Sequence, residues 1–288
     1  MTIFKSPQAR ATILGWQDRF RARIGRPLES RQLQTRFGPS HALLCGPEDA
    51  PPIVLLHGAM ASSAHALLEV VALADRYRVI ALDIIGQSPL SAEARPDVNG
   101  LAYGQWLIDC LDALELPTVR LLGASWGGFV ALRAATLAPA RIEKLSLIVP
   151  AALVQGSPWE GFTKCGLPML LYQLSPSPAR RDRFLKNLFT TMDPDWVAYL
   201  GDAFLCYKMD FRPPRLVQGA ELAALTAPVQ VFGAEQDVSF PGAPLLVRAR
   251  QVFPNLASAE LLTGAKHTPS FDPEDRCRLT AKIAAFMA

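Results

Sequence analysis

Short apolar segments alternate with longer stretches of helical periodicity between residues 52 and 149, and this alternation restricts the possible folds more than any other feature. The segments lack the apolar–polar alternation of half-exposed strands, so they are typical of strands buried on both faces of a parallel sheet. The predicted strands are Pro52–His57, Arg78–Asp83, Val119–Ala124 and Lys144–Val149. The predicted helices are Ala61–Tyr77, Tyr103–Leu114 and Trp126–Leu137. The pattern predicts an α/β fold with a mostly parallel sheet flanked by helices.

The alternation stops at Pro150 and resumes near residue 220. The intervening segment, residues 151–219, contains clustered prolines and aromatic-rich helical stretches. The elements predicted beyond it are strands at Pro228–Phe232 and Ala259–Leu262, a helix through Leu245–Val252, and a last helix from Pro273. We therefore expect an α/β core formed by residues 1–150 and 220–288, with residues 151–219 as a helical cap insertion.

The N-terminal segment precedes this pattern. Apolar residues recur at helical spacing from Pro7 to Ile24, with arginines between them, and predict an amphipathic helix. Its basic face suits either a membrane surface or a solvated helix docked on the domain, and we favour the docked helix. Alternation in Ser30–Phe37 and a second segment at His41–Cys45 predict a hairpin.

Composition excludes several classes of protein. The chain has 288 residues, of which 50% are hydrophobic and 19% charged, and a net charge of +3 from 29 basic and 26 acidic residues spread along it. Because no basic block stands out, neither nucleic acid nor an anionic membrane is expected as a partner. The longest apolar runs are about half the length of a membrane span, and the N-terminus lacks the apolar stretch of a signal peptide. A cytoplasmic protein is expected.

Five cysteines are spaced far apart and contain no C-x-x-C pair: Cys45, Cys110, Cys165, Cys206 and Cys277. This odd, scattered set argues against a disulfide framework or a cysteine-based zinc site. We expect buried free thiols in a reducing compartment.

The sharpest local motif is Gly123-Ala124-Ser125-Trp126-Gly127, which ends a predicted strand and begins a predicted helix. A serine hydroxyl becomes a useful nucleophile when a tight strand-to-helix turn projects it toward a base. Such a turn brings backbone segments close together, which explains glycine on both sides. Ser125 is therefore the predicted nucleophile.

The predicted base and acid lie downstream. In chains with this nucleophile turn the order is serine, acid, histidine, and His267 alone among the four histidines follows Ser125. The loop after the predicted strand ending at Phe232 contains Glu235 and Asp237. We favour Asp237, because it lies deeper in the loop and has the shorter side chain for orienting an imidazole. Glu235 stays open as the alternative.

An oxyanion hole needs a second backbone donor from the loop after the first parallel strand. That loop begins His57-Gly58-Ala59-Met60, so the N–H of Ala59 is expected to act with the N–H of Trp126. Met60 is the expected wall of the substrate pocket. We interpret His57 as a residue that orients the loop rather than as a base.

With these motifs together, residues 32–286 resemble the α/β-hydrolase superfamily, and the insertion lies where that family carries its cap. The segments LLHGAMASS, YRVIALDIIGQSPLS and LLGASWGGFVALR resemble small bacterial carboxylesterases. The resemblance implies Ser125 as nucleophile, His267 as general base and acid, Asp237 as its orienter, and Ala59 and Trp126 as oxyanion donors. One loop departs from the family: many members have D-x-x-G-x-G-x-S, whereas this chain has Asp83-Ile84-Ile85-Gly86-Gln87-Ser88.

These features predict a serine hydrolase that cleaves small carboxylic esters through an acyl-enzyme. Dehalogenases and epoxide hydrolases of this fold use aspartate at the elbow, so serine disfavours them. Neither a phosphate-binding loop nor an H-E-x-x-H site occurs, and neither a cofactor nor a metal is expected. A thioesterase or lactonase, a C–C bond hydrolase and a slow-turnover binding protein are the alternatives. The C–C hydrolase needs an arginine near the nucleophile; the sequence places none there, although Arg133 lies on the predicted helix after Ser125. The sequence leaves the oligomeric state open.

Specificity is expected to depend on the cap. Its aromatic and apolar residues either line the substrate pocket or form the cap's own core. They are Trp159, Phe162, Met169, Leu170, Tyr172, Phe189, Trp196, Tyr199, Phe204 and Tyr207.

Overall fold

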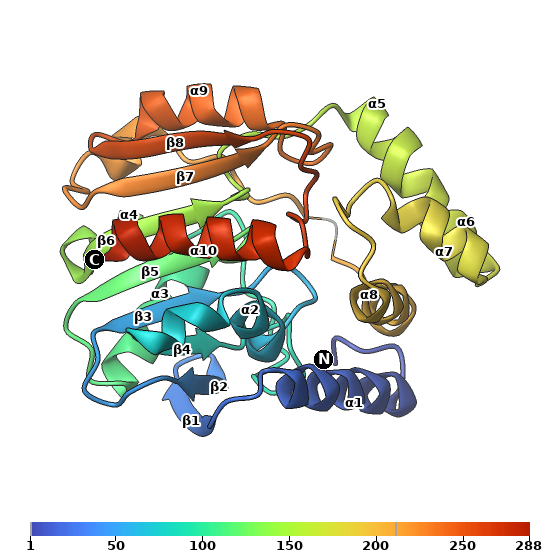
Figure 1. The fold of residues 1–288 in the computed structure, drawn as a ribbon, viewed down its shortest axis with the longest axis horizontal. Coiled ribbons are helices and arrows are strands. Elements are labelled where there is room, and N and C mark those ends of the chain that lie inside the picture. Colours follow the sequence, from blue (N-terminus) through green and yellow to red (C-terminus); the bar gives the residue numbers. More distant parts are fainter. Residues whose placement is uncertain (1, 211) are drawn as a thin grey trace.

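The computed structural model describes residues 2–210 and 212–288, which form one eight-stranded sheet with helices on both faces (Figure 1). The strand order is β1-β2-β4-β3-β5-β6-β7-β8, and all neighbours beyond the antiparallel pairs β1–β2 and β2–β4 run parallel. The strands are β1 (Glu29–Thr35), β2 (Gly38–Cys45), β3 (Pro52–Leu56), β4 (Arg78–Leu82), β5 (Val119–Ala124), β6 (Ile142–Ile148), β7 (Val229–Ala234) and β8 (Leu256–Leu262). The predicted mostly parallel α/β sheet is confirmed.

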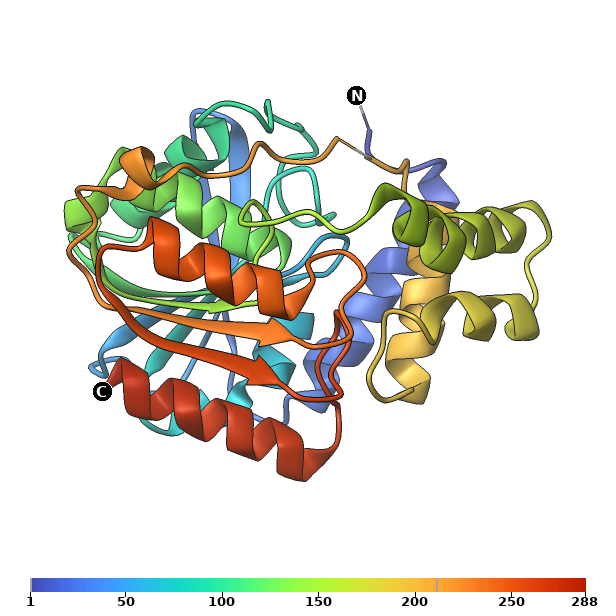
Figure 2. The same ribbon diagram turned by 90° about the horizontal axis from the view of Figure 1, so that it is seen from above.

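Helices of the core cover the sheet in two layers (Figure 2). They are α2 (Ser63–Glu69), α3 (Ala102–Ala113), α4 (Trp126–Leu137), α9 (Gly242–Val252) and α10 (Pro273–Met287). Residues of β3 alternate between the layers: Val54 packs in the cluster that includes α3, α4 and α9, and Ile53 in the cluster that includes α2 and α10. Burial on both faces explains why the central strands are apolar throughout.

Helix α1 (Pro7–Arg23) lies against the domain, as predicted, with Ile13 and Phe20 buried. The predicted helix over Ala61–Tyr77 is instead divided into α2 and a 3-10 turn at Val71–Asp75. The prediction of buried thiols is wrong for Cys277, which is exposed, although all five cysteines are free.

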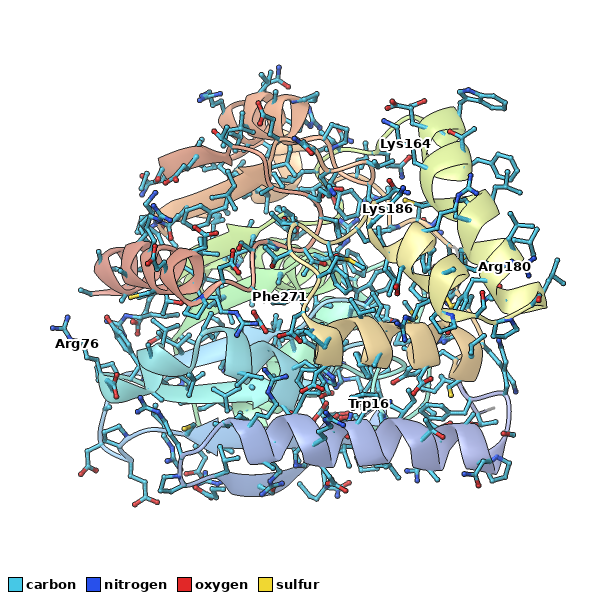
Figure 3. The ribbon with its side chains drawn as sticks, turned by 45° about the vertical axis from the view of Figure 1, so that its right-hand side comes forward. Trp16, Arg76, Lys164, Arg180, Lys186 and Phe271 are labelled. Atoms are coloured by element: carbon cyan, nitrogen blue, oxygen red, sulfur yellow. The ribbon has the colours of Figure 1, made fainter. Side chains whose placement is uncertain are left out.

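Four α-helices occur among the described residues between β6 and β7: α5 (Pro158–Gly161), α6 (Leu167–Leu174), α7 (Pro178–Leu185) and α8 (Pro194–Cys206), with a π-helical turn at Phe162–Gly166 joining α5 to α6. We call them the cap helices. Helix α8 packs against α1, whereas α5 to α7 lie farthest from the sheet in both views (Figures 1 and 2). Figure 3 shows Lys164, Arg180 and Lys186 on or beside these outer helices. The cap boundaries at 151 and 219 stay a prediction.

Within the described residues, the helices are all too short or too polar to cross a lipid bilayer.

Candidate active site

Ser125 occupies the sharp turn between β5 and α4. Its φ of 50° and ψ of −112° lie in a region that residues other than glycine rarely adopt, so the backbone is strained here. Neighbouring segments hold the turn: the Ser125 N–H donates to the carbonyl of Ile148 at 2.9 Å, and its carbonyl accepts from the Gly128 N–H at 3.0 Å. A Cβ on Gly127 would lie 2.2 Å from the carbonyl oxygen of Leu56, so the approach of α4 to β3 requires glycine.

Three predicted site residues meet at the carboxyl edge of the sheet. His267 Nε2 lies 3.0 Å from Ser125 Oγ, and His267 Nδ1 lies 2.8 Å from Asp237 Oδ2. The other carboxylate oxygen, Asp237 Oδ1, accepts hydrogen bonds from the N–H groups of Ser239 and Phe240 at 2.7 and 3.1 Å. The structure therefore places serine, histidine and aspartate in one hydrogen-bonded chain, in loops that follow β5, β8 and β7.

The alternative acid, Glu235, has a different environment. Its exposed carboxylate accepts a hydrogen bond from the Gly264 N–H at 2.7 Å and has no bond to His267 within the described chain. Between the two acids that the sequence left open, only Asp237 contacts the imidazole.

Electrostatics favour an ionised aspartate beside a basic histidine. Burial disfavours the Asp237 carboxylate, but the charge and hydrogen bond of His267 and the two backbone N–H donors outweigh it and lower the pKa of Asp237. Burial likewise opposes protonation of His267, yet the charge and hydrogen bond of Asp237 prevail and raise the pKa of His267 above 6.5. The pair can therefore stabilise an imidazolium that forms when His267 takes a proton.

The loop after β3 lies beside the serine. A Cβ on Gly58 would be 3.6 Å from Ser125 Cβ, and Ala59 lines the same cavity as Ser125. Among the described residues, no protein group accepts a hydrogen bond from the N–H of Ala59 or of Trp126. The role of these two N–H groups as oxyanion donors stays a prediction.

His57 has both ring nitrogens engaged. Nδ1 is 2.7 Å from the carbonyl oxygen of Gly58, and Nε2 accepts a hydrogen bond from the Ile84 N–H at 2.9 Å. This pattern requires the neutral ring with its proton on Nδ1, and burial lowers the pKa of His57 in agreement with that. His57 consequently links the loop after β3 to the loop after β4.

Met60 is held from two sides. Its N–H donates to Gln87 Oε1 at 3.1 Å, and its carbonyl accepts from the Tyr199 hydroxyl. Gln87 comes from the loop after β4 and Tyr199 from the cap helix α8, so core and cap both position this loop. The sequence did not predict that Gln87 and Tyr199 hold Met60. The loop of Gln87 stood out only because it lacks a glycine of the family pattern, and Tyr199 was one of several residues expected to line the pocket or form the core of the cap.

Asp83 is buried at the start of the loop after β4, the loop that also contains Gln87. Its carboxylate contacts several neighbouring segments. Its carboxylate accepts from the Ser63 N–H at 3.0 Å and the Ser63 hydroxyl at 2.6 Å, and lies 2.7 Å from His41 Nδ1. Burial favours its neutral form, but the hydrogen bonds from His41 and Ser63 help to lower the pKa of Asp83. These contacts fix the start of α2 to β2 and β4.

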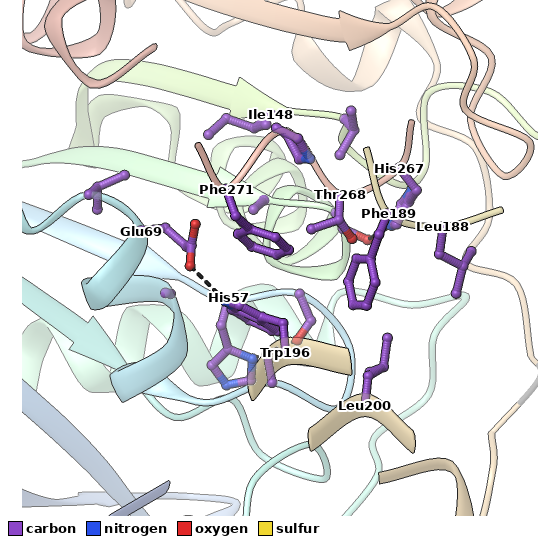
Figure 4. Close-up of a pocket in the computed structure, with 18 of the residues that line it drawn as sticks. His57, Glu69, Ile148, Leu188, Phe189, Trp196, Leu200, His267, Thr268 and Phe271 are labelled. Atoms are coloured by element: carbon purple, nitrogen blue, oxygen red, sulfur yellow. Dashed lines mark hydrogen bonds between the residues drawn. The ribbon is translucent and has the colours of Figure 1, made fainter. Parts of the chain in front are cut away.

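A cavity of about 320 Å³ extends from Ser125 and His267 beneath the cap (Figure 4). Its walls are mostly apolar, as expected for a site that takes a hydrophobic ligand. The cap residues that line it are Leu188, Phe189, Trp196, Tyr199, Leu200 and Phe204, and Met60 and Ile148 join them from the core.

Other cap residues do not reach this cavity. Tyr172 and Tyr207 are buried within apolar clusters, which agrees with the interpretation as cap core. Trp159, Phe162 and Leu170 are exposed, so both predicted roles, pocket wall and cap core, are wrong for them. The outer helices have no layer of protein beyond them to bury these side chains (Figure 1).

Glu69 lies on the side of the cavity opposite His267 (Figure 4). Glu69 Oε1 accepts hydrogen bonds from Trp196 Nε1 and Arg276 Nη2, each at 2.9 Å. Burial raises the pKa of Glu69 to about 7, against the opposing effect of Arg276. The carboxylate thereby connects α2, α8 and α10. No sequence signal distinguished Glu69 from other acidic residues on helices.

Arg133 is not at the cavity. Its guanidinium is buried and donates to the carbonyl of Arg215 at 2.5 Å and to Glu221 at 3.4 Å, away from the cavity walls. The arginine that lines the cavity, Arg276, is paired with Glu69.

Comparisons with known proteins agree with this geometry. Residues 53–278 match the model of the alpha/beta hydrolase family. Two proteins of Bacillus subtilis (strain 168) are similar in sequence: an uncharacterised carboxylesterase, 35% identical over 43% of this chain, and carboxylesterase YbfK, 36% identical over 43% of this chain. The matched segments cover 41% and 43% of those proteins, or about two fifths of their length.

Solved structures extend the likeness to the whole fold. A crystal structure of a putative hydrolase from Bacillus subtilis superposes with a TM-score of 0.84 at 22% identity, covering 98% of this chain and 100% of that one. Naproxen esterase from Bacillus subtilis superposes with a TM-score of 0.81 at 22% identity, covering 99% and 100%. The chain is thus similar in sequence to bacterial carboxylesterases and shares their fold.

Proposed function

Because this chain belongs to the α/β-hydrolase family, we propose that it is a serine hydrolase that cleaves small carboxylic esters through an acyl-enzyme. The observation that carries the proposal is the hydrogen-bonded chain Ser125–His267–Asp237 at the end of an apolar cavity, beside two N–H groups without protein acceptors. Similarity to bacterial carboxylesterases supports the same reaction.

In the first step, Ser125 Oγ attacks the ester carbonyl while His267 Nε2 accepts the hydroxyl proton. The negative charge on the carbonyl oxygen is stabilised by the N–H groups of Ala59 and Trp126, each worth about 3 to 4 kcal/mol in the transition state. Collapse of the tetrahedral intermediate breaks the bond to the alcohol oxygen. His267 then protonates the departing alcohol, and the acyl group remains on Ser125.

In the second step, a water molecule loses its proton to His267 and attacks the acyl carbonyl. Collapse releases the carboxylic acid, and the proton returns from His267 to Ser125 Oγ. His267 must be neutral to start either step, so the rate falls as the pH drops below its pKa, which Asp237 raises above 6.5. Asp237 stays ionised and holds the imidazole in the required tautomer.

The cavity favours neutral, apolar esters over acidic substrates. A C–C bond hydrolase needs a cation for a substrate carboxylate, whereas Arg133 is turned away and the Arg276 guanidinium is hydrogen-bonded to Glu69. The five cysteines, all free, fit a reducing compartment and hence the expected cytoplasmic location.

The test is steady-state hydrolysis of p-nitrophenyl esters from acetate to laurate by wild type and Ser125→Ala. We expect multiple turnovers by wild type and a loss of about 10⁴- to 10⁶-fold in kcat for Ser125→Ala. Ser258→Ala, a serine on β8 outside the cavity, serves as the matched control and should retain full activity.

Activity that survives in Ser125→Ala would exclude Ser125 as the nucleophile. A single burst of p-nitrophenol without further turnover would instead support the slow-turnover binding protein.

A further inference from the structure

The outer cap helices expose an unusual amount of apolar surface. Nine large apolar side chains are exposed among the described residues, and six of them lie in the continuous helical run from Pro158 to Leu174. We call these six the outer stripe: Trp159, Phe162, Leu167, Leu170, Leu171 and Leu174. Trp159 and Leu174, at its two ends, are 72% and 74% exposed. A contiguous apolar surface of this kind marks an interaction site.

The stripe lies on one side of the helical run. Its members are all exposed, and most of them follow one another at a spacing of three residues, which is typical of one helix face. The opposite side faces the protein, where Tyr172 is buried. Trp159 and Phe162 also contact each other, with ring centroids 6.5 Å apart. The stripe is therefore a continuous surface separate from the cavity, since none of its members lines the cavity.

Basic side chains accompany the stripe. Residues 158–186 contain five basic residues (Lys164, Arg180, Arg181, Arg183 and Lys186) and two acidic ones (Glu160 and Asp182), giving a net charge of +3. This segment thus has the same net charge as the whole chain of 288 residues.

Four of these basic residues lie on or just after α7, which packs against α6. Arg181 pairs with Asp182, which leaves Arg180, Arg183 and Lys186. All three are exposed, and within the described chain their side chains form no ion pair with a carboxylate. We call them the basic rim; in Figure 3 Arg180 lies beside the outer helices and Lys186 lies nearer the core. Their charge is available to an external partner.

Contrary to the expectation from the charge distribution along the sequence, we propose that the outer stripe and the basic rim dock on the surface of an anionic phospholipid bilayer. Tryptophan, phenylalanine and leucine side chains enter the boundary between headgroups and acyl chains, while arginine and lysine bind the phosphates above it. A second copy of this chain fits less well, because a two-fold contact between identical surfaces brings the basic rims together without acidic partners. The charge therefore selects an anionic surface.

The same cap segment continues into the wall of the cavity. Leu188 and Phe189, directly after the basic rim, line the cavity, and Thr190 donates a hydrogen bond to the carbonyl of Thr268, next to His267, at 2.7 Å. The basic rim and this part of the cavity wall therefore belong to one continuous stretch of chain.

The experiment measures binding of the full chain to sedimented vesicles of phosphatidylcholine alone and of phosphatidylcholine mixed equally with phosphatidylglycerol. We expect binding to the anionic vesicles to be at least tenfold tighter and to weaken with added salt. The double variants Trp159→Ser/Leu174→Ser and Arg180→Glu/Arg183→Glu should each lose at least tenfold in affinity. Trp159 fluorescence should shift to shorter wavelength on binding, and Trp159→Phe should remove the shift but keep the binding.

Matched controls come from α9, on the core. Val247 is 54% exposed and Arg250 is exposed, so Val247→Ser/Arg250→Glu changes the same kinds of side chain away from the cap and should bind like wild type. All variants should hydrolyse a soluble ester at the wild-type rate, which shows that they fold. Ser125→Ala should still bind vesicles, so docking and the proposed hydrolysis succeed or fail separately.

Equal affinity for both vesicle types, or variants of the stripe and rim that bind like wild type, would overturn the proposal. A concentration-dependent dimer in sedimentation velocity that Trp159→Ser/Leu174→Ser abolishes, without vesicle binding, would assign the outer stripe to a second copy and also overturn it.

Discussion

Helix α8 and the helical run α5–α6 belong to the same insertion, and their sequences are alike: each begins with a capping residue followed by proline, and each carries apolar and aromatic residues at helical spacing. Their environments differ. Trp196, Tyr199 and Phe204 of α8 are buried and line the cavity, whereas Trp159 and Phe162 are exposed.

The difference follows from the number of neighbours. Helix α8 is enclosed by α1, by the cavity loops and by α7, so its apolar residues have partners on several sides. The outer run packs on one side only and faces solvent on the other (Figure 2). An amphipathic pattern therefore predicts a helix, but tertiary contacts decide whether an apolar face becomes core or a docking surface.

The largest expected contrast is in stability. Trp196 stacks on Phe271, with ring centroids 5.2 Å apart, and donates to Glu69. Trp196→Ala should lower the free energy of unfolding by about 3 to 5 kcal/mol, because it leaves a cavity and removes a partner of a buried carboxylate. Chemical denaturation measures this. Trp159→Ala, the matched change on the outer run, should cost less than about 0.5 kcal/mol, and comparable losses for the two would contradict the contrast.

A second effect depends on pH and concerns Glu69, the residue of α2 that accepts a hydrogen bond from Trp196 of α8. The pKa of Glu69 is raised to about 7 in the folded chain, against 4.5 for the free group. Between these values the folded state holds a proton that the unfolded state has released, so the free energy of unfolding falls by up to about 3 kcal/mol as the pH rises from 4.5 to 7.

Glu69→Gln isolates the contribution of Glu69 to the pH dependence of the free energy of unfolding. Glutamine can still accept hydrogen bonds from Trp196 and Arg276, but it does not titrate. Denaturation curves at several pH values should show a shallower decline for the variant. Identical pH profiles would mean that Glu69 is ionised throughout.

A third, smaller effect tests how the cap holds the loop after β3. Tyr199→Phe removes the hydroxyl that donates to the Met60 carbonyl. We expect a loss of about 1 kcal/mol in stability and a several-fold fall in kcat, with KM for p-nitrophenyl acetate nearly unchanged. On the core side, Gln87→Leu removes the oxygen that accepts a hydrogen bond from the Met60 N–H, and it should lower kcat in the same way. An unchanged kcat in both variants would show that the loop holds its position without them.

The smallest effect is expected on the outer run itself. Leu174, 74% exposed, should tolerate Leu174→Ser with a change within about 0.5 kcal/mol and no change in kcat for a soluble ester. Thermal unfolding and steady-state kinetics measure both. A large destabilisation would mean that Leu174 packs against protein, and that the outer run resembles α8 after all.

Much of the fold could be predicted from local sequence. The continuous apolar segments such as Pro52–His57 indicated strands buried on both faces, and the structure has β3 there. The motif around Ser125 predicted a turn that the structure shows as a strained strand-to-helix junction. These predictions succeed because periodicity and glycine placement are local properties of the chain.

Contacts between distant segments were harder to predict. The choice between Asp237 and Glu235 depended on which carboxylate faces His267, and the loops after β7 and β8 determine that. Gln87 and Tyr199 meet at Met60 although 112 residues separate them, and neither carries a local signal for that role. Such roles arise only when separate loops gather at the edge of the sheet.

The sequence by itself determined the class of fold, the serine at the turn and the order of the residues that follow it, because these depend on short-range geometry. The tertiary structure decided which acid orients His267, what lines the cavity and which apolar face of the cap stays exposed. Burial is a property of neighbouring elements rather than of a helix alone. For that reason Trp196 and Trp159, in similar helical sequences, have opposite environments.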